Sequence, residues 1–556
     1  MCHANSFTEV ENGTGRRDSN NQPNMVDDLR TRKRIYDMDE ALSKTKFGLF
    51  NYIVICVTGL ILFVSFLETC SISYILPVLC DMDLTASQKG ALTAAPFVGI
   101  ICSSHLWGFA ADTKGRRRVI LPSLLTAFIL SIICSFVQNY YIFTFLRFLN
   151  GFFVSSSAGI YAYLGEFHNS IQRSRAIMVS AVIYSTLCIT MPITAWSVIN
   201  QDWQFEIPII DLTYKPWRLL VVVCGIPGFL SALALFFLPE SPKYVLSQGN
   251  KMAAYQILQK MNRWNNGKNA QLELFEIREE VESTETKSNN IDGISHLSFL
   301  QTIWNQTSAL FKPPYLKSTI LVCTIQFGIF SISHGFSLFF AEIVNKMSAN
   351  LDNFYDQRIM MCDNINTKPM NSTAQTEICV EKLDLSTIET GLSIEIIFAV
   401  GSVLAGLLIN KIGKFSIIFV ILMLSGFAGI GAMLTDIPAL QVPLFVWLFS
   451  CCIAINVVAS ATFDLYPTSL RAMAMSIALM FGRLGAVTGT NAAAILLENH
   501  CETTFYLSGS ILLVMAALSF FIPNIHKKIN ESAEQNPVKS NHRPSVLSFS
   551  GSFRGV

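Results

Sequence analysis

The stretch "GFAADTKGRRR", residues 108–118, decides the fold because it sets a dense group of charges between two long apolar segments. One Asp and four basic residues fall within 112–118, whereas only 14% of the whole chain is charged. In helical membrane proteins, Lys and Arg collect in the short loops on the cytoplasmic side. The stretch therefore predicts a cytoplasmic loop that joins two membrane-spanning helices.

The composition of the chain is typical of a membrane protein. Of its 556 residues, 51% are hydrophobic, and the charged fraction is well below the roughly 25% of soluble domains. A membrane-spanning helix needs about 20 mainly apolar residues. Segments of that kind occur at 48–79, 89–111, 119–138, 140–164, 176–200, 217–238, 316–345, 388–410, 415–435, 441–463, 472–496 and 503–523. The sequence thus predicts an all-α membrane protein with twelve transmembrane helices, surrounded by the lipid bilayer.

Basic residues in the short connections predict the orientation of the chain. With the N-terminus inside, the cytoplasmic connections contain Lys114, Arg116, Arg117, Arg118, Arg173, Arg175, Lys411, Lys414 and Arg471. The opposite connections are mainly acidic, with Asp81, Asp202 and Glu502 among their residues. We therefore expect both termini in the cytoplasm of a multi-pass protein, in the plasma membrane or in an intracellular vesicle membrane.

A long polar segment divides the apolar segments into two groups of six. Apolar residues in its first part recur at helical spacing, which predicts short amphipathic helices. The expected organisation is a disordered cytoplasmic N-terminal tail at 1–46, a six-helix bundle at 47–242, a cytoplasmic central loop at 243–314, a second six-helix bundle at 315–523 with an outer loop at 346–387, and a cytoplasmic C-terminal tail at 524–556.

The two bundles carry related motifs at one fixed offset. "GFAADTKGRRR" at 108 recurs weakly as "GLLINKIGKFS" at 406, and "EFHNSIQRSRA" at 166 recurs as "DLYPTSLRAMA" at 464. Both pairs are 298 residues apart, which indicates a duplicated six-helix unit. Duplicated bundles related by an axis along the membrane normal are typical of transporters, with the substrate site between the halves.

One polar outer loop combines two cysteines with a glycosylation motif. Cys362 and Cys379 flank the sequon Asn371-Ser372-Thr373 within this loop. An oxidising outer compartment favours a Cys362–Cys379 disulfide and a glycan on Asn371. Two free thiols and an unused sequon are the alternative. Most of the other cysteines lie in apolar segments, where packing is the expected role.

Several motifs together resemble one known family. The loop "GFAADTKGRRR" is similar to the signature loop of the major facilitator superfamily, and "PESPK" at 239–243 resembles its sugar-porter and organic-ion branches. "YKPWRLLVVVCGIPG" and "SFVQNYYIFTFLRFLNG" resemble the branch of synaptic vesicle glycoprotein 2 and its related proteins. The outer loop is shorter than in the vesicle glycoproteins, and Asn410 replaces an acidic residue in the second copy of the loop motif.

The resemblance implies transport of a small organic solute, a sugar or an organic ion, by alternating access. Glu68 and Arg147 resemble the acid and the arginine that proton-coupled sugar porters place on their first and fourth helices, so a proton is a second expected substrate. An ionisable group inside a membrane costs about 2.5–3.5 kcal/mol and needs a reason. A static ion pair, or an arginine that reaches the membrane surface, remains an alternative to coupling.

Other intramembrane residues are candidates for the substrate cavity. Arg483 resembles the cation that organic-ion transporters place there, and it would attract an anionic substrate. Tyr184 and Asn456 occupy places where related carriers put cavity-lining groups. A position near the membrane surface for Arg483, and ordinary packing for the other two, remain open.

The charged loop predicts a gate. Asp112 precedes a helix whose N-terminus favours an acid, and Glu166 and Arg173 flank the cytoplasmic end of the fourth helix. A network of these charges would hold one conformation until substrate shifts the balance. The gating motif comprises Gly108, Asp112, Gly115, Arg116, Arg117, Glu166 and Arg173, with Asp464 and Arg471 in the second copy. Because Asn410 lacks a charge, we expect the second copy to be the weaker latch.

Several classes of function lack support in the sequence. A net charge of +1 predicts no nucleic-acid partner. We find neither metal-ligand spacing nor a phosphate-binding loop, so we expect no cofactor, no metal, no enzymatic activity and a monomer. The rival hypothesis is a non-transporting vesicle or membrane protein of the same fold that acts as a binding partner.

Overall fold

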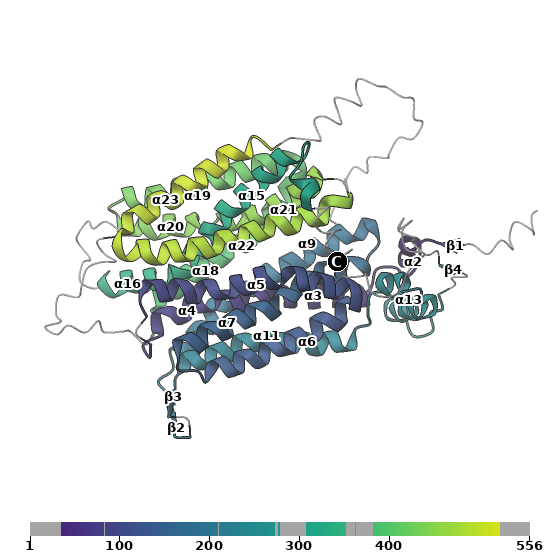
Figure 1. Ribbon diagram of the computed structural model, residues 1–556, viewed down its shortest axis with the longest axis horizontal. Helices are drawn as coiled ribbons and strands as arrows, with labels where there is room; N and C mark the ends of the chain where they lie inside the picture. The colour runs from purple at the N-terminus through teal and green to yellow at the C-terminus, as the bar shows by residue number, and fades with distance from the viewer. Residues whose placement is uncertain are drawn as a thin grey trace, which may run out of the picture.

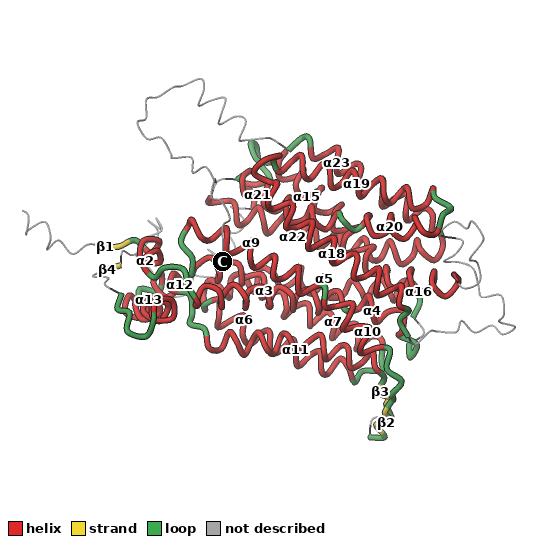
Figure 2. Tube along the Cα trace, turned by 180° about the vertical axis from the view of Figure 1, so that it is seen from behind, coloured by secondary structure: helices red, strands yellow, loops and turns green. Residues whose placement is uncertain are grey.

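The structure is a computed structural model that describes residues 35–82, 84–209, 211–272, 276–277, 307–351, 362, 382–466 and 468–522. Two helical halves lie side by side, and their helices run along the long axis of the molecule (Figure 1). We call the end that carries α2 (Met38–Lys44), α12 (Pro242–Ser247) and α13 (Lys251–Asn266) the linker end. The hairpin end carries the antiparallel strands β2 (Phe205–Ile207) and β3 (Leu212–Tyr214), as the view from behind also shows (Figure 2).

The N-terminal half contains the first group of spanning helices. These are α3 (Leu49–Cys70) with α4 (Ile72–Ile75) and η1 (Leu76–Val78), α5 (Ala86–Lys114), α6 (Arg116–Ser135), α7 (Tyr140–Val154) with η2 (Ser155–Gly159) and α8 (Ile160–Glu166), α9 (Ser170–Cys188) with α10 (Thr190–Ile199), and α11 (Pro216–Phe237). A short parallel pair, β1 (Ile35–Tyr36) and β4 (Glu276–Ile277), lies beside α2.

The C-terminal half repeats this pattern. Its helices are α15 (Leu316–Phe330) with η3 (Ser331–Gly335), η4 (Phe336–Phe339) and α16 (Phe340–Leu351), α18 (Leu385–Ile412), α19 (Lys414–Leu434), α20 (Pro438–Leu448) with α21 (Cys451–Leu465), α22 (Thr468–Asn499) and α23 (Cys501–Ser519). The halves meet mainly where α5 packs on α22 and where α9 packs on α18.

Within the described residues, 11 helical segments are long and apolar enough to span a membrane. The remaining predicted segment, 140–164, is helical but is divided by η2 into helices of 15 and 7 residues. The serines of η2 bind three neighbouring helices: Ser155 contacts Ser104 at 3.2 Å, Ser157 contacts Ser65 at 2.5 Å and Ser156 contacts Ser123. These hydroxyl contacts explain the interruption, because they draw the backbone toward three partners at once.

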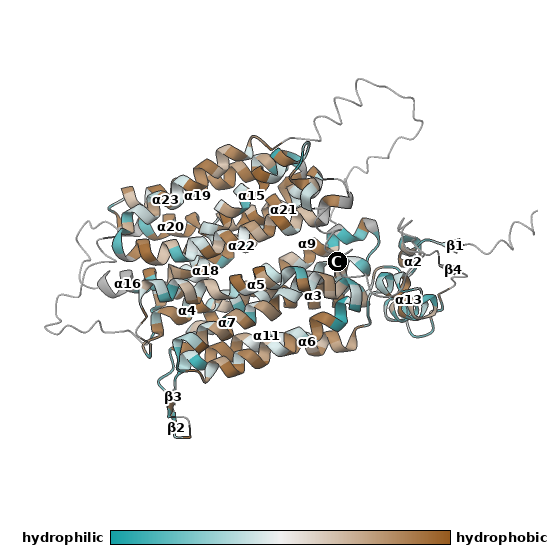
Figure 3. Ribbon diagram, in the orientation of Figure 1, coloured by the Kyte–Doolittle hydropathy of each residue, from teal (hydrophilic) through white to brown (hydrophobic). Residues whose placement is uncertain are grey.

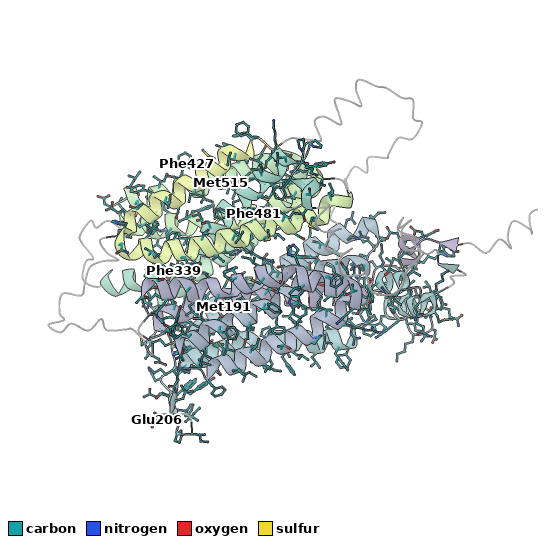
Figure 4. The ribbon with its side chains drawn as sticks, viewed as in Figure 1. Met191, Glu206, Phe339, Phe427, Phe481 and Met515 are labelled. Atoms are coloured by element: carbon teal, nitrogen blue, oxygen red, sulfur yellow. A yellow bond between two sulfur atoms is a disulfide. The ribbon has the colours of Figure 1, made fainter. Side chains whose placement is uncertain are left out.

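The outer surface of the helices is apolar. Figure 3 shows hydrophobic residues along both halves, with hydrophilic residues gathered at the linker end. Phe427 on α19 is 58% exposed, whereas Met191 and Phe339 are buried (Figure 4). Exposure of many large apolar side chains would promote aggregation in water, but it suits a surface that contacts lipid.

The N-terminal segment is ordered further than the sequence analysis predicts. Residues 35–46 contain β1 and α2, and Met38, Ala41 and Leu42 of α2 are buried in the described structure. The prediction of a disordered tail over 1–46 is therefore wrong for 35–46, because an apolar face of α2 packs against α13. Residues 1–34 lie outside the described residues.

The predicted Cys362–Cys379 disulfide is also wrong. Cys362 forms its disulfide with Cys501, at the start of α23, with 5.7 Å between the two Cα atoms. The fold brings together two residues 139 positions apart, so nearness in one loop is a poor guide to pairing. Cys80 is disulfide-bonded as well. Cys379 and Asn371 lie outside the described residues.

Candidate functional site

The duplicated loops have the same backbone conformation at the same offset. Gly115 precedes α6 with φ +102° and ψ 144°, and Gly413 precedes α19 with φ +91° and ψ 149°. Only glycine adopts this region readily, because a side chain would collide with the neighbouring peptide. The repeated glycine is therefore a requirement of the sharp turn between two antiparallel helices.

Glu240 of the "PESPK" motif caps the charged loop. Its carboxylate accepts hydrogen bonds from the backbone N–H groups of Arg117 (3.1 Å) and Arg118 (3.3 Å), in the first turn of α6. Gly115 itself has no side chain to cap this helix, and an acid at a helix N-terminus is stabilising. The sequence analysis noted the motif but missed this role for Glu240. The sequence did contain a signal for this role, because Glu240 and the basic loop at 108–118 are both predicted at the cytoplasmic face of the membrane.

Arg116 is the centre of the predicted gate. Its guanidinium forms ion pairs with Asp112 at 2.9 Å and Glu166 at 3.1 Å, and it donates to the carbonyl of Ala111 at 3.2 Å. Arg116 and Glu166 are 15% and 17% exposed, so water screens this pair weakly, whereas Asp112 is 72% exposed and its pair with Arg116 is well screened. The described contacts of Arg116 thus join α5, α6 and α8 within the N-terminal half.

Arg117 performs a different task from Arg116. It donates to the carbonyls of Leu235 (3.0 Å) and Phe236 (2.6 Å) in the last turn of α11. A cation at a helix C-terminus satisfies carbonyl groups that have no partner within the helix. Arg117 therefore fixes α6 against α11.

Arg173 does not pair with Glu166 among the described residues. Its Nε donates to the carbonyl of Gly165 at 3.1 Å, and its Nη2 lies 4.0 Å from Asp39 on α2. Asp39 also pairs with Lys243 of α12 at 2.9 Å. Within the expected network of charges, Arg173 is therefore tied to the N-terminal segment by Asp39.

His168 is a buried polar residue in the loop between α8 and α9. Its Nδ1 lies 2.8 Å from the carbonyl of Leu164. Burial lowers the pKa of His168, so the ring is neutral at pH 7 and Nδ1 carries the donated proton. The residue closes this loop by packing, and it adds no charge to the neighbouring gate.

The second copy of the gate is only partly described. Asp464 and Arg471 belong to α21 and α22, but their side chains lie outside the described residues, as does that of Asn410. Lys414, which corresponds to Arg116 in the repeat, donates to the carbonyl of Ser460 at 2.9 Å. Gly108 and Gly406, the first residues of the two motifs, have nothing within 4 Å of the position of an added Cβ.

Glu68 and Arg147 are neighbours, and both are almost fully buried. The Glu68 carboxylate accepts hydrogen bonds from Ser131 (2.9 and 3.0 Å) and from the side-chain amide of Asn150 (2.9 Å). The guanidinium of Arg147 donates to the main-chain carbonyl of Glu68 at 3.2 Å. Among the described residues, no ion pair within 4.0 Å joins the Glu68 carboxylate to Arg147.

Two polar side chains at this site were missed by the sequence analysis. Asn150 follows Arg147 by three positions in "RFLN", so helical spacing places both on one face of α7 and was the available signal. Ser131 comes from α6, and no motif or spacing in the sequence around it indicates a contact with Glu68. The Nε and Nη2 atoms of Arg147 are buried without a hydrogen-bond partner, so this guanidinium has donors to spare for the nearby carboxylate.

Two of the three predicted cavity residues, Arg483 and Tyr184, lie at the contact between the halves. Arg483 on α22 donates to Ser104 on α5 at 2.7 Å, which joins the two halves directly. The ring of Tyr184 on α9 contacts Phe66 on α3 (6.3 Å between centroids) and Phe398 on α18 (6.2 Å). Asn456 on α21 is exposed, with no hydrogen bond among the described residues. A half-buried arginine and an aromatic cluster thus lie at the contact between the halves.

The sequence matches one family over most of its length. Residues 58–354 and 359–553 match the family described as the Major Facilitator Superfamily. Relatives include synaptic vesicle glycoprotein 2B of Homo sapiens, 26% identical over 312 residues, which are 53% of this chain and 46% of that protein. Synaptic vesicle glycoprotein 2A of Rattus norvegicus is 27% identical over 317 residues, 54% of this chain and 43% of that protein. The chain thus spans about half the length of these curated relatives.

Solved structures show the same fold. The xylose transporter XylE from E. coli, in a partially occluded inward open conformation, has a TM-score of 0.59 at 14% identity and covers 85% of this chain and 98% of its own. A D-xylose-proton symporter has a TM-score of 0.56 at 14% identity, with the same coverage of both chains. Together with the sequence match, the two-bundle fold and the repeated loop identify the chain as a member of the major facilitator superfamily.

Proposed function

We propose that the chain transports a small organic solute, a sugar or an organic ion, by alternating access. The observation that carries this proposal is the contact between the halves. α5 packs on α22 and α9 packs on α18, and ionisable groups such as Arg483 lie in these helices. Ionisable residues inside a membrane protein mark pathways and binding sites. Both termini face the cytoplasm in this proposal, so the linker end is the cytoplasmic end.

The hairpin end is closed by contacts between the two halves. Lys89 on α5 forms an ion pair with Glu342 on α16 at 2.6 Å. The side-chain amide of Asn200 donates to the carbonyl of Leu383 at 2.8 Å and accepts from its N–H at 2.8 Å. At the linker end, Gly108 and Gly406 have open space beside them. These features support an inward-facing conformation, with the outer gate closed.

In the opposite conformation, the loops at the linker end would approach each other. The network of Asp112, Arg116 and Glu166 would then be the N-terminal component of an inner gate, and Asp464 and Arg471 would be its counterparts. Rocking of duplicated halves about a fixed site is the expected motion of this architecture. A substrate shifts the equilibrium only to the extent that it binds one conformation better.

We also propose that Glu68 exchanges a proton during transport. The carboxylate lies beside the spare donors of Arg147, while Ser131 and Asn150 hold it in place. Protonation would remove the charge of the carboxylate and weaken its electrostatic attraction to the nearby guanidinium of Arg147, which would change how α3 packs on α7. A D-xylose-proton symporter among the structural neighbours supports this reading.

A second candidate function is a membrane component of vesicles that binds a partner without transport. Its support is the similarity to synaptic vesicle glycoproteins 2A and 2B, which covers just over half of this chain. The two candidates differ in whether a purified chain moves any solute.

Uptake by the full chain in proteoliposomes tests the proposal. We expect accumulation of at least one of D-xylose, tetraethylammonium and p-aminohippurate above empty liposomes when a pH gradient is imposed. Glu68→Gln should lose gradient-driven accumulation but keep exchange of labelled for unlabelled solute, because the variant cannot release a proton. Glu206→Gln, at an exposed position of strand β2 in the β2–β3 hairpin, is the matched control.

The outcomes separate the two candidates. Uptake of none of the probes by folded protein contradicts this proposal and favours the binding component. Full gradient-driven accumulation by Glu68→Gln would contradict proton exchange at Glu68 while leaving transport in place.

A further inference from the structure

Helix α18 has two different faces. Ile396, Val400, Val403 and Leu407 recur at helical spacing, and each is 39–67% exposed, so they form the lipid-facing stripe. Glu395 lies off this stripe, and Gly391, Phe398 and Ser402 share its side of the helix. The Ser402 hydroxyl is buried without a hydrogen-bond partner. The polar face of α18 therefore points toward the protein interior.

Residues from both halves surround Glu395. Cys70 and Tyr74 from the first spanning segment, and Tyr184 from α9, lie close enough to its carboxylate to interact electrostatically. Cys452 on α21, which belongs to the same C-terminal half as Glu395, also interacts electrostatically with this carboxylate. The hydroxyl of Tyr74 lies 2.5 Å from the position of an added Cβ at Gly391, one turn before Glu395. Glu395 thus lies between the two halves, not against lipid.

This carboxylate lacks a counter-charge. Glu395 is half-buried, and among the described residues it has no hydrogen bond to its side chain and no Lys, Arg or His as an interacting neighbour. Arg483 instead binds Ser104. An unpaired charge inside a membrane costs about 2.5–3.5 kcal/mol. Glu68, another acid within a spanning segment, differs because it has three polar contacts within its own half.

Aromatic rings complete the surroundings of Glu395. Tyr184 contacts Phe66 and Phe398 edge to face, and Phe398 is one turn from Glu395 on the same face of α18. Tyr74 contacts Phe340 in the same way, at 5.3 Å between centroids. A carboxylate flanked by aromatic rings attracts an organic ammonium group through charge and through the negative ring faces. Sugar recognition would call for several amide or hydroxyl partners, whereas the titratable groups that interact with Glu395 include two thiols and two tyrosines, whose rings also suit a cation.

We propose that Glu395 binds the positively charged group of the substrate, with Tyr184 and Tyr74 beside it, so that the cargo is a small organic cation. The inference rests on the proposed transport function and narrows its substrate class. In this arrangement the cation supplies the counter-charge for Glu395, and it contacts both halves at once. Arg483 then acts as a structural link between α5 and α22.

Binding of labelled tetraethylammonium to the purified full chain in nanodiscs tests the inference without requiring transport. We expect saturable binding that Glu395→Gln weakens by about tenfold or more, as expected for a desolvated contact with a cation. Glu389→Gln is the matched control, because Glu389 lies on the same helix and is exposed. D-xylose and p-aminohippurate should not compete for this site.

A second pair of variants keeps the test decisive if Glu395→Gln folds poorly. Tyr184→Phe keeps the ring and should keep tetraethylammonium affinity, whereas Tyr184→Leu removes the ring and should weaken binding severalfold. Equal affinity in both variants would contradict the aromatic part of the site.

The result separates this inference from the proposed function. Binding of only D-xylose or p-aminohippurate, binding of no probe, or unchanged tetraethylammonium affinity in Glu395→Gln would overturn the cation site, even if uptake occurs. Glu395-dependent binding of tetraethylammonium without uptake of any probe would support the site and would contradict transport.

Discussion

At the scale of single residues, Gly115 and Glu240 explain why two separate motifs occur in one chain. Gly115 makes the turn that a side chain would strain, and the Glu240 carboxylate caps the helix that follows. The glycine therefore leaves space for the acid. In the repeat, Gly413 makes the same turn with nothing within 4 Å of an added Cβ. The two glycines form a natural comparison.

Alanine at these glycines should destabilise the protein by different amounts. Both substitutions force a positive φ on alanine, which costs about 1–3 kcal/mol. Gly115→Ala adds a collision, because the new Cβ would lie 2.7 Å from Oε2 of Glu240. We expect Gly115→Ala to lower the melting temperature in detergent clearly more than Gly413→Ala. Equal losses would show that the Glu240 contact contributes nothing beyond the turn.

Residue-level contacts also show what the sequence could and could not predict. The sequence placed Arg116, Asp112 and Glu166 in one gating motif, and the three charges lie together because the loop and the end of α8 share one end of the bundle. The partner of Arg173 was missed, since Asp39 belongs to a segment whose polar composition resembles a disordered tail. The partner of Cys362 was missed because the start of α23 is distant in sequence. Motifs in the sequence predict contacts between residues that are close along the chain. Contacts between distant residues arise only from the way the helices pack.

At the scale of elements, glycines set how closely the helices approach. A Cβ added at Gly151 on α7 would overlap the main-chain oxygen of Pro96 on α5. In the other half, a Cβ at Gly485 on α22 would overlap the main-chain oxygen of Phe327 on α15. Small residues allow such backbone contact between membrane helices, where dispersion forces drive association. Apolar segments alone predicted the helices, but not which pairs touch at their backbones.

Gly151→Ala should push α5 and α7 apart. Overpacking of a tight contact typically costs about 1–3 kcal/mol. Gly159→Ala is the control within the same predicted span, because its nearest neighbour would be Ile120 at 3.8 Å, which is ordinary contact. We expect a large fall in the melting temperature in detergent for Gly151→Ala and little change for Gly159→Ala. A similar fall in both would mean that flexibility of the segment matters more than the contact.

At the scale of the whole molecule, the two ends differ in how the halves are joined. The hairpin end has two kinds of ion pair between the halves. Lys89 and Glu342 are 25% and 13% exposed, whereas Lys382 and Asp202 are 56% and 82% exposed, with 2.6 Å between the charged atoms in both pairs. Exposed pairs contribute little because water screens them. The Lys89–Glu342 pair is therefore the stronger candidate for the outer latch.

Charge reversal of the Lys89–Glu342 pair should open the hairpin end. Lys89→Glu sets two carboxylates against each other in a partly buried place, which is strongly unfavourable. The distance between spin labels at Gln201 and Leu385, which are exposed on opposite halves, should then lengthen in electron–electron resonance measurements. Adding Glu342→Lys should restore the short distance, because the pair re-forms with its charges exchanged.

The exposed pair provides the control for this experiment. Lys382→Ala should leave the label distances nearly unchanged, since a screened pair contributes at most about 1 kcal/mol. If Lys89→Glu also leaves them unchanged, packing at the hairpin end, such as Tyr74 against Phe340, holds the halves together without the charges. If the double variant stays open, Glu342 has a second role at its native position, and the outer latch is a network rather than a pair.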